Sequence, residues 1–235
     1  MGINPEISVN TIIFDYDGTL CEFSIPFLKM RKEIIDLLTE RLENTQNYFS
    51  LDDRISITGR KAKEFLMKNN RENEWDDLKI EIEEILKRWE WKAAKTNEIY
   101  PIVLEILNYL KDNNIKLGIF TLEPKDIIHF LLEKNKIHSF FTSIISRDDV
   151  VNAKPDAEHL MKVLEELDSD PKNTLVIGDH PVDMECADKI GAFSIAVLNK
   201  RHRIEDFTHC KVNFFIEHIS EFKKLLNSKV IIKKS

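Results

Sequence analysis

Apolar residues along this chain form two patterns, short continuous runs and helical spacing, which alternate over most of its length. Short apolar runs predict buried strands at 11–14, 115–120, 143–145, 174–177 and 193–197, with a weaker one near 212–216. Between these runs, apolar residues recur at helical spacing. Strands that alternate with helices are typical of a parallel sheet with helices on its faces. The pattern therefore predicts an α/β fold built on a parallel sheet.

The segment between the first two predicted strands breaks this alternation. From about residue 21 to residue 96 the sequence shows only amphipathic helical patterns, and the block is far longer than an ordinary crossover connection. It predicts a small α-helical domain at 21–96, inserted into a core domain formed by 1–20 and 97–235. Two stripes should form the inserted domain's core: Phe27, Met30, Ile34, Leu38 and Leu42, and Trp75, Leu78, Ile82, Ile85, Leu86 and Trp89, with Trp91 nearby.

Two aspartates follow the first predicted strand, in the run Asp15-Tyr16-Asp17-Gly18-Thr19. Alternate residues of an extended chain point to the same side, roughly 6.6 Å apart, so both carboxylates can face one site. Gly18 permits a sharp turn beside them, because glycine adopts backbone conformations that other residues avoid.

A second acidic pair follows the strand predicted at 174–177, in Gly178-Asp179-His180-Pro181-Val182-Asp183. Open α/β sheets bind their ligands at such carboxyl ends. Two like charges about 4 Å apart repel by roughly 4 kcal/mol at an effective dielectric constant of about 20. A hard divalent cation removes this repulsion, and ligation by oxygen alone favours Mg²⁺ over Zn²⁺. The sequence therefore predicts a Mg²⁺ site among these four aspartates.

Two further residues complete a predicted phosphate site. An aspartate needs no base to act as a nucleophile at neutral pH, since its ordinary pKa is about 3.9, but it must approach another anion. Thr121 ends the strand predicted at 115–120, where its hydroxyl and backbone N–H can hold a phosphoryl oxygen. Lys154 precedes Pro155 and a helix predicted from about Asp156, and supplies a positive charge.

In this order, the motifs resemble the four signatures of the haloacid dehalogenase-like superfamily: Asp15-x-Asp17-Gly18-Thr19, Thr121, Lys154-Pro155 and Gly178-Asp179-x-x-x-Asp183. The resemblance covers about residues 9–20 and 97–230 and implies a Rossmann-like core with an α-helical cap. Asp17 favours the phosphatase branch, with its phosphoglycolate phosphatase and β-phosphoglucomutase relatives, because the true dehalogenases lack an aspartate at this position.

The resemblance also implies a role for each motif residue. Asp15 would attack phosphorus, and Asp17 would protonate the leaving oxygen and then activate water, its backbone carbonyl also touching Mg²⁺. Asp15 and Asp179 would bind the metal directly, with Asp183 as a further ligand or just behind them. Thr121 and Lys154 would hold the phosphoryl group, beside Gly18.

Some residues near the motifs depart from the family pattern or allow a simpler interpretation. Glu123 stands where relatives often carry Asn, and His180 where a small hydroxyl residue is common. Asp183 can serve simply as an acidic residue in a first helical turn. His180 and Cys21 are interpreted as residues without a catalytic role.

The run Thr58-Gly59-Arg60 is interpreted as a polar break between helices of the cap, where Arg60 reads a remote anionic group of the substrate. The alternative is an ordinary solvated helix start from Ser56 to Lys63.

These features predict a Mg²⁺-dependent phosphatase that acts on a small phosphorylated metabolite through an aspartyl-phosphate on Asp15. A sugar-phosphate mutase of the β-phosphoglucomutase type would share every core residue. A non-catalytic binding protein on the same scaffold is a third possibility, although the complete set of catalytic carboxylates speaks against it.

Net charge and cysteine content bear on the expected partners and cellular compartment. The chain has 34 basic and 41 acidic residues and a formal net charge of −7, which disfavours a nucleic-acid partner. Cys21, Cys186 and Cys210 match no metal-ligand spacing and predict free thiols in a reducing compartment. No stretch resembles a signal or membrane segment. We therefore expect a cytoplasmic enzyme, monomeric or homodimeric, without a membrane partner.

Overall fold

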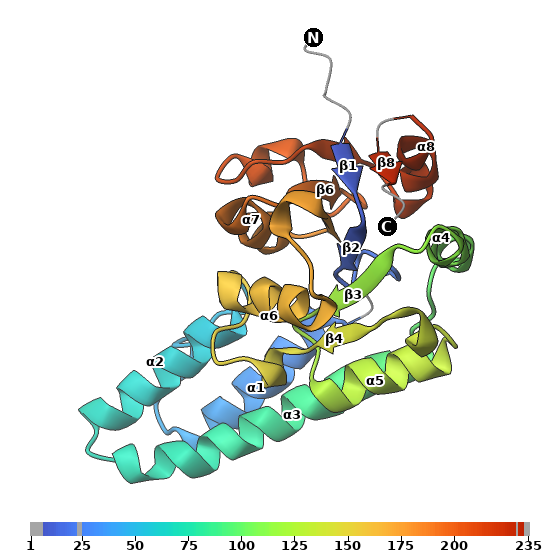
Figure 1. Ribbon diagram of the computed structural model, residues 1–235. Helices are drawn as coiled ribbons and strands as arrows, with labels where there is room; N and C mark the ends of the chain where they lie inside the picture. The colour runs from blue at the N-terminus through green and yellow to red at the C-terminus, as the bar shows by residue number, and fades with distance from the viewer. Residues whose placement is uncertain (1–6, 23–24, 229, 233–235) are drawn as a thin grey trace. The chain divides into compact units, whose positions relative to one another are not determined.

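The computed structural model describes residues 7–22, 25–228 and 230–232, and the chain divides into two compact units (Figure 1). The core unit comprises Met1–Phe23 and Asn97–Ser235, and the helical unit comprises Ser24–Thr96. Each unit buries apolar clusters of its own.

A six-stranded sheet forms the centre of the core unit. Its strands stand in the order β4-β3-β2-β5-β6-β7, and every neighbouring pair is parallel. The sequence predicted each of these strands to within two residues, and the predicted α/β fold is confirmed. Their bounds are β2 (Thr11–Phe14), β3 (Lys116–Phe120), β4 (Ser143–Ile145), β5 (Thr174–Gly178), β6 (Phe193–Val197) and β7 (Phe214–Ile216).

Helices cover both faces of this sheet (Figure 1). Alternate residues of β2 point to opposite faces: Ile13 joins the buried cluster beneath α6 and α7, whereas the Phe14 ring meets Phe222 of α8 edge to face, with centroids 6.4 Å apart. Apolar residues at helical spacing thus form the inner faces of the helices. The helices of the core unit are α4 (Pro101–Asp112), α5 (Lys125–Lys134), α6 (Ala157–Leu167), α7 (Pro181–Ile190) and α8 (Phe222–Leu226).

The central strand β2 lies between β3 and β5. Phe14 is in register with Ile119 on one side and Ile177 on the other. The carboxyl ends of the three strands therefore meet where the strand order reverses, which is where open α/β sheets bind ligands.

A second, two-stranded parallel sheet pairs β1 (Ile7–Val9) with β8 (Val230–Ile232). This sheet is not predicted by the sequence pattern. A three-residue strand shows too little alternation to be recognised, and its pairing partner lies at the other end of the chain.

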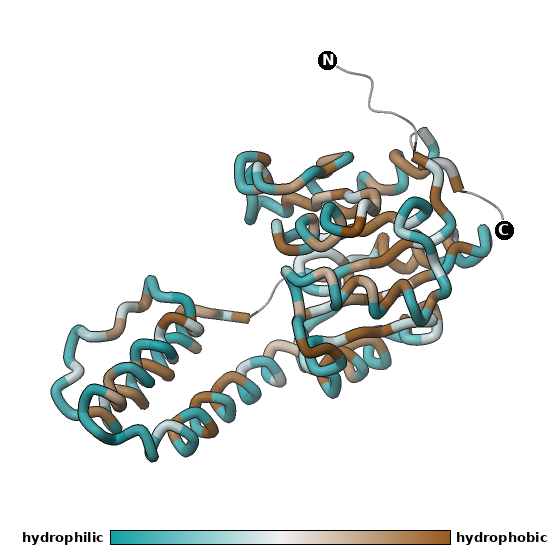
Figure 2. The backbone as a smooth tube through the Cα atoms, turned by 60° about the vertical axis from the view of Figure 1, so that its left-hand side comes forward, coloured by the Kyte–Doolittle hydropathy of each residue, from teal (hydrophilic) through white to brown (hydrophobic). Residues whose placement is uncertain are grey.

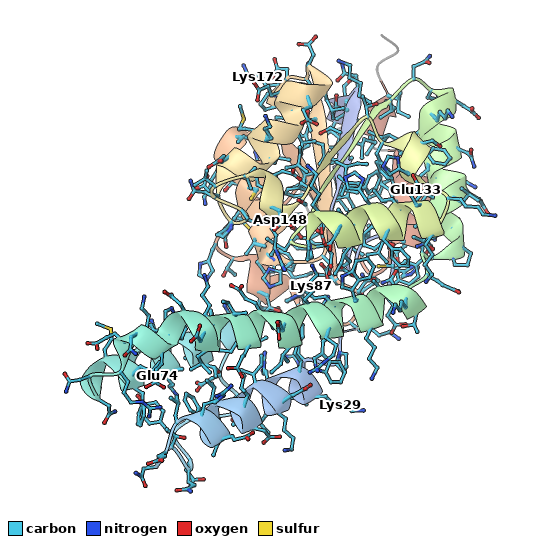
Figure 3. The ribbon with its side chains drawn as sticks, turned by 90° about the horizontal axis from the view of Figure 1, so that it is seen from below. Lys29, Glu74, Lys87, Glu133, Asp148 and Lys172 are labelled. Atoms are coloured by element: carbon cyan, nitrogen blue, oxygen red, sulfur yellow. The ribbon has the colours of Figure 1, made fainter. Side chains whose placement is uncertain are left out.

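The helical unit contains α1 (Phe27–Arg41), α2 (Ile55–Lys68) and α3 (Trp75–Thr96), and its described residues include no strand. Hydrophobic and hydrophilic residues alternate along these helices at helical spacing (Figure 2). Figure 3 labels Glu74, which directly precedes α3, and Lys87, near the middle of that helix. The inward-facing residues form one buried cluster: Met30, Ile34, Leu38, Leu42, Phe49, Ala62, Leu66, Leu78 and Ile82.

Phe27, a member of the first predicted stripe, and Trp91, predicted near the second, differ from expectation. Phe27 is 37% exposed, because it is the first residue of α1, and its ring lies under the Arg31 guanidinium at 5.9 Å. Trp75 and Trp89 pack against the buried cluster as predicted, whereas Trp91 is half-buried and outside it.

Short 3-10 helices connect these elements, and none of the helices in the described ranges combines the length and apolar character needed to span a bilayer. The 3-10 segments are Glu72–Glu74, His138–Phe140, Arg147–Asp149, Pro171–Asn173, Ile204–Phe207 and Ile219–Glu221.

Candidate active site

The loop after β2 carries Asp15 and Gly18 to the point where the strand order reverses. The backbone N–H of Asp15 donates to the carbonyl of Ile177 on β5 at 2.9 Å, so the sheet fixes the position of Asp15. Gly18 has φ of +76°, and a Cβ atom there would lie 2.1 Å from Oδ2 of Asp179. Only glycine fits this turn, because a side chain would collide with a carboxylate of the site.

The end of β5 and the first turn of α7 add two buried carboxylates, Asp179 and Asp183. Oδ2 of Asp183 accepts the backbone N–H of His180 at 3.0 Å, and Nδ1 of His180 accepts the N–H of Val182 at 3.2 Å. His180 therefore caps α7. Asp183 lies in the first helical turn, as the simpler interpretation predicted, and also inside the acidic cluster.

Lys154 joins two of these carboxylates. Its Nζ donates to Oδ1 of Asp15 and to Oδ1 of Asp183, both at 2.7 Å. The Lys154 side chain is only 1% exposed, and its ammonium lies 3.7 Å from the centroid of the Phe120 ring. Two carboxylates and an aromatic face hold this cation in one place.

Carboxylate oxygens of Asp15, Asp179 and Asp183 lie within 4.8 Å of one another. Magnesium takes oxygen ligands at about 2.0–2.1 Å, so one ion can contact oxygens this close together. The three acidic residues outnumber the two cations that contact them, Lys154 and Arg201, which leaves negative charge for a further cation to neutralise. The donor set therefore fits a hard divalent cation.

Burial and mutual repulsion shift the pKa values of these groups. Burial raises the pKa of Asp15 well above its usual range, against the lowering effect of Lys154. Burial also raises the pKa of Asp179 to about 7, and the neighbouring Asp183 adds to the rise. Burial lowers the pKa of Lys154, but Asp15 and Asp183 outweigh it and the net shift is upward, so Lys154 stays charged. A cation at this site would favour the ionised carboxylates.

A buried histidine on α6, His159, binds the backbone of Lys154. The sequence pattern did not single it out. Nδ1 of His159 accepts the backbone N–H of Lys154 at 3.3 Å, and Nε2 lies 3.1 Å from the carbonyl of Ile145, to which it donates. Burial lowers the pKa of His159 to about 4, so the ring is neutral. Its place in the apolar stripe of α6, one turn before Val163, was the signal for its burial.

Asp17 lies beside a second acid and outside the group of three carboxylates. Burial raises the pKa of Asp17, and a hydrogen bond with the Glu123 side chain partly offsets the rise. A hydrogen bond between two carboxyl groups requires that one of them carries a proton. Glu123 therefore faces Asp17 rather than solvent. The Cys21 thiol, 3.7 Å from Oδ1 of Asp17, has its pKa raised by burial, as expected of an inert thiol.

Thr121 requires a correction. Its side chain is buried at the end of β3, but its backbone N–H donates to the carbonyl of Ile145 at 3.0 Å. The expectation that this N–H holds a phosphoryl oxygen is wrong, because the ladder between β3 and β4 continues one residue past the strand. The Thr121 hydroxyl oxygen accepts the N–H of Glu123 at 3.1 Å, so only the hydroxyl proton is left to contact a substrate.

Arg60 lies in the helical unit, and the interpretation of Thr58-Gly59-Arg60 as a break between helices is wrong. α2 runs without interruption through these residues from Ile55, because Gly59 adopts helical backbone like its neighbours. The Arg60 side chain is 69% exposed and lies 3.9 Å from Glu64, one turn along the helix. The alternative of an ordinary helix start describes this segment correctly.

The sequence analysis also missed Arg201, whose Nη1 donates to Oδ2 of Asp179 at 2.7 Å. Arg201 lies in the loop after β6, and its guanidinium is close to Gly18. The basic run Lys200-Arg201-His202-Arg203 directly after a predicted strand was the available signal.

Comparison with known proteins places this geometry in context. A family model described as haloacid dehalogenase-like hydrolase matches residues 12–197. The pyrophosphatase PpaX of Bacillus cereus (strain G9842) is 27% identical over 227 residues, which cover 94% of this chain and 97% of the relative.

Solved structures share the fold. A HAD phosphatase from Thermococcus onnurineus superposes with a TM-score of 0.62 at 23% identity, over 94% of this chain and 99% of that one. A structure described as a predicted phosphoglycolate phosphatase from Haemophilus somnus 129pt gives a TM-score of 0.69 at 18% identity, over 92% and 97%. Likeness at these identities concerns the fold alone.

Proposed function

Because the chain belongs to the haloacid dehalogenase-like hydrolases, we propose that it is a phosphatase that hydrolyses a phosphomonoester of a small metabolite through an aspartyl-phosphate on Asp15. The family match confirms the resemblance inferred from the four motifs. One observation carries the proposal: buried Asp15 lies 2.7 Å from the Lys154 ammonium and within the cluster formed with Asp179 and Asp183.

We propose Mg²⁺ as the cofactor. Asp15, Asp179 and Asp183 would hold it, together with the backbone carbonyl of Asp17. When bound, it supplies the positive charge that lets two anions, a carboxylate and a phosphoryl group, approach each other.

The proposed chemistry proceeds in two steps on the chain's own residues. In the first, a carboxylate oxygen of Asp15 bonds to phosphorus while the bond from phosphorus to the leaving oxygen breaks, and Asp17 gives that oxygen its proton. In the second, Asp17 takes a proton from water, whose oxygen bonds to phosphorus and releases Asp15 and inorganic phosphate. Lys154 and the Thr121 hydroxyl hold the phosphoryl oxygens in both steps.

The burial of Asp17 suits the first step of this cycle. Burial raises its pKa, which favours the protonated acid needed in the first step.

We propose that the helical unit selects the substrate, with Arg60 as a candidate contact for a remote anionic group. The name of one relative points to pyrophosphate and that of one structural neighbour to phosphoglycolate, so both compounds belong in a substrate panel.

The test is phosphate release from a panel of phosphorylated metabolites, pyrophosphate and p-nitrophenyl phosphate, with and without Mg²⁺. Release that requires Mg²⁺ and disappears in Asp15→Asn would support the proposal. Asp112→Asn, an exposed aspartate at the end of α4, is the matched control and should retain activity.

Other results would favour the alternatives. Transfer of phosphate between positions of a glucose phosphate, without net release, would indicate a mutase. The absence of both reactions with every substrate would indicate a binding protein. Full activity of Asp15→Asn would exclude Asp15 as the nucleophile.

A further inference from the structure

A cavity of about 540 Å³ adjoins the acidic cluster on the side of the loop after β6. Arg201 stands at its boundary with the site: the guanidinium contacts Asp179, which is 3% exposed, while the arginine side chain is 36% exposed. The residues that line this cavity are Gly18, Glu22, Tyr100, Asn199, Lys200, Arg201, Glu217 and His218.

The conformation of the loop after β6 places Arg201 beside Asp179. Asn199 and Lys200 both have positive φ, of 46° and 61°, so the chain turns sharply after β6. The Asn199 side chain donates to the carbonyl of Gly18. On the far side of Arg201, the His202 ring packs edge to face on His180, with centroids 5.0 Å apart. The loop is therefore anchored on both sides of the arginine.

Arg201 uses the carboxylate that a metal ion would need. Its Nη1 is 2.7 Å from Oδ2 of Asp179, and Asp179 is one of the three residues whose oxygens converge. The guanidinium also lies against the turn at Gly18, where a Cβ atom would be 2.9 Å from Nη1. A divalent cation and a guanidinium that share one carboxylate repel each other, so each lowers the occupancy of the other.

The neighbouring cavity offers the Arg201 guanidinium an alternative position with acidic partners. Glu22 and Glu217 both line it, and each offers a carboxylate to a displaced guanidinium. No other side chain in the described part of the core makes an ion pair to Asp179.

We propose that Arg201 is an internal counter-cation for Asp179 that leaves this carboxylate and turns into the Glu22/Glu217 cavity when a divalent cation binds. Arg201 thereby sets the affinity of the site for its metal. The inference rests on the proposed metal site.

The experiment is calorimetric titration of Mg²⁺ into chelator-treated protein without substrate, so that no turnover enters the readout. Arg201→Gln should bind Mg²⁺ about tenfold more tightly than the unmodified protein, if the arginine holds Asp179 in about nine molecules of ten. The matched control is Lys200→Gln, which removes the same charge from the same cavity without touching Asp179, and its affinity should stay within about twofold.

A second readout separates this exchange from a general change in charge. Arg201→Gln should lower the melting temperature of the metal-free protein, because Asp179 loses its counter-cation, and saturating Mg²⁺ should close the gap to the unmodified protein. Glu217→Gln should weaken Mg²⁺ binding, because the displaced arginine loses one of its acceptors.

The outcomes distinguish the inference from its premise. If none of the proteins binds Mg²⁺, the proposed metal site fails, and the inference fails with it. If the unmodified protein binds Mg²⁺ and Arg201→Gln binds equally or more weakly, or no differently from Lys200→Gln, the role of Arg201 is wrong while the metal site stands. Arg201→Lys, which keeps the charge, should bind more like the unmodified protein than Arg201→Gln does.

Discussion

Lys154 shows how much of the candidate site depends on one side chain. Its ammonium is buried and shared between Asp15 and Asp183 at 2.7 Å each. Taking such charges out of water is costly, and the cost is recovered only while all partners are present. Loss of any one partner would therefore leave an uncompensated buried charge, so Lys154 matters to stability as well as to the proposed phosphate site.

Replacement of Lys154 by Met should destabilise the metal-free protein by about 3–5 kcal/mol, because two buried carboxylates lose their counter-ion. Urea unfolding in the presence of a chelator measures this change. The loss should shrink in the double variant with Asp183→Asn, which removes one of the stranded charges. Lys162→Met, at a lysine whose side chain is 43% exposed, should change stability by no more than about 0.5 kcal/mol, and a similar value for Lys154→Met would contradict the prediction.

Asp17→Asn should slow phosphate release by about 10²–10⁴-fold, because an amide can neither donate the proton to the leaving oxygen nor accept one from water. Rapid-quench kinetics should show both the formation and the breakdown of the phosphoenzyme slowed. An unchanged rate would remove Asp17 from the chemistry, and a slowing of only one step would assign it only to that step.

At the scale of elements, α6 does more than cover the sheet. Its buried stripe contains His159, which accepts the backbone N–H of Lys154 and donates to Ile145 at the end of β4. The helix thus connects the lysine-bearing loop to the sheet through a neutral imidazole, and protonation of this imidazole would remove the acceptor of the Lys154 N–H.

The contribution of His159 to the free energy of unfolding should fall as the pH drops, whereas the raised pKa values of Asp15, Asp17 and Asp179 act in the opposite direction. Burial lowers the pKa of His159 from 6.5 to about 4 in the folded protein, so between these values the unfolded chain binds the proton more readily. The stabilisation is present above about pH 6.5, and about 2 kcal/mol of it should be lost between about pH 7 and about pH 5. Urea unfolding at the two pH values isolates this contribution as a difference between proteins: on going from about pH 7 to about pH 5, His159→Gln should gain about 2 kcal/mol relative to the unmodified protein. His209→Gln, at an exposed histidine, should follow the unmodified protein. The same pH dependence in all three proteins would rule out the role of His159.

At the scale of the whole molecule, the acidic cluster is a local feature of a fold that has other sources of stability. The core unit buries apolar residues on both faces of its sheet, and the helical unit has a cluster of its own. The proposed cation would therefore be needed for chemistry but not for folding, and it would stabilise the folded protein only by its own binding free energy.

Removal of divalent cations with a chelator should abolish phosphate release while the far-UV circular dichroism of the protein stays the same. Restored Mg²⁺ should recover activity fully and raise the unfolding free energy by about 2.7 kcal/mol at a hundredfold excess over its Kd. Activity that persists after exhaustive chelation would contradict metal dependence. Loss of helical signal would show instead that the ion supports the fold.

The chain's own order of residues determined the strands of the main sheet, the helical insertion and the motif aspartates, because apolar periodicity and residues at strand ends are local properties. Proximity between distant segments was decided by the tertiary structure. The sheet order that places β2 between β3 and β5 brings Asp15 to Asp179, and the loop after β6 brings Arg201 to the same carboxylate. The pairing of β1 with β8 joins the two ends of the chain, and the neutral His159 and the engaged N–H of Thr121 both depend on the carbonyl of Ile145 in another element. A sequence pattern does not specify such partners, since burial and hydrogen bonding depend on where the rest of the molecule lies.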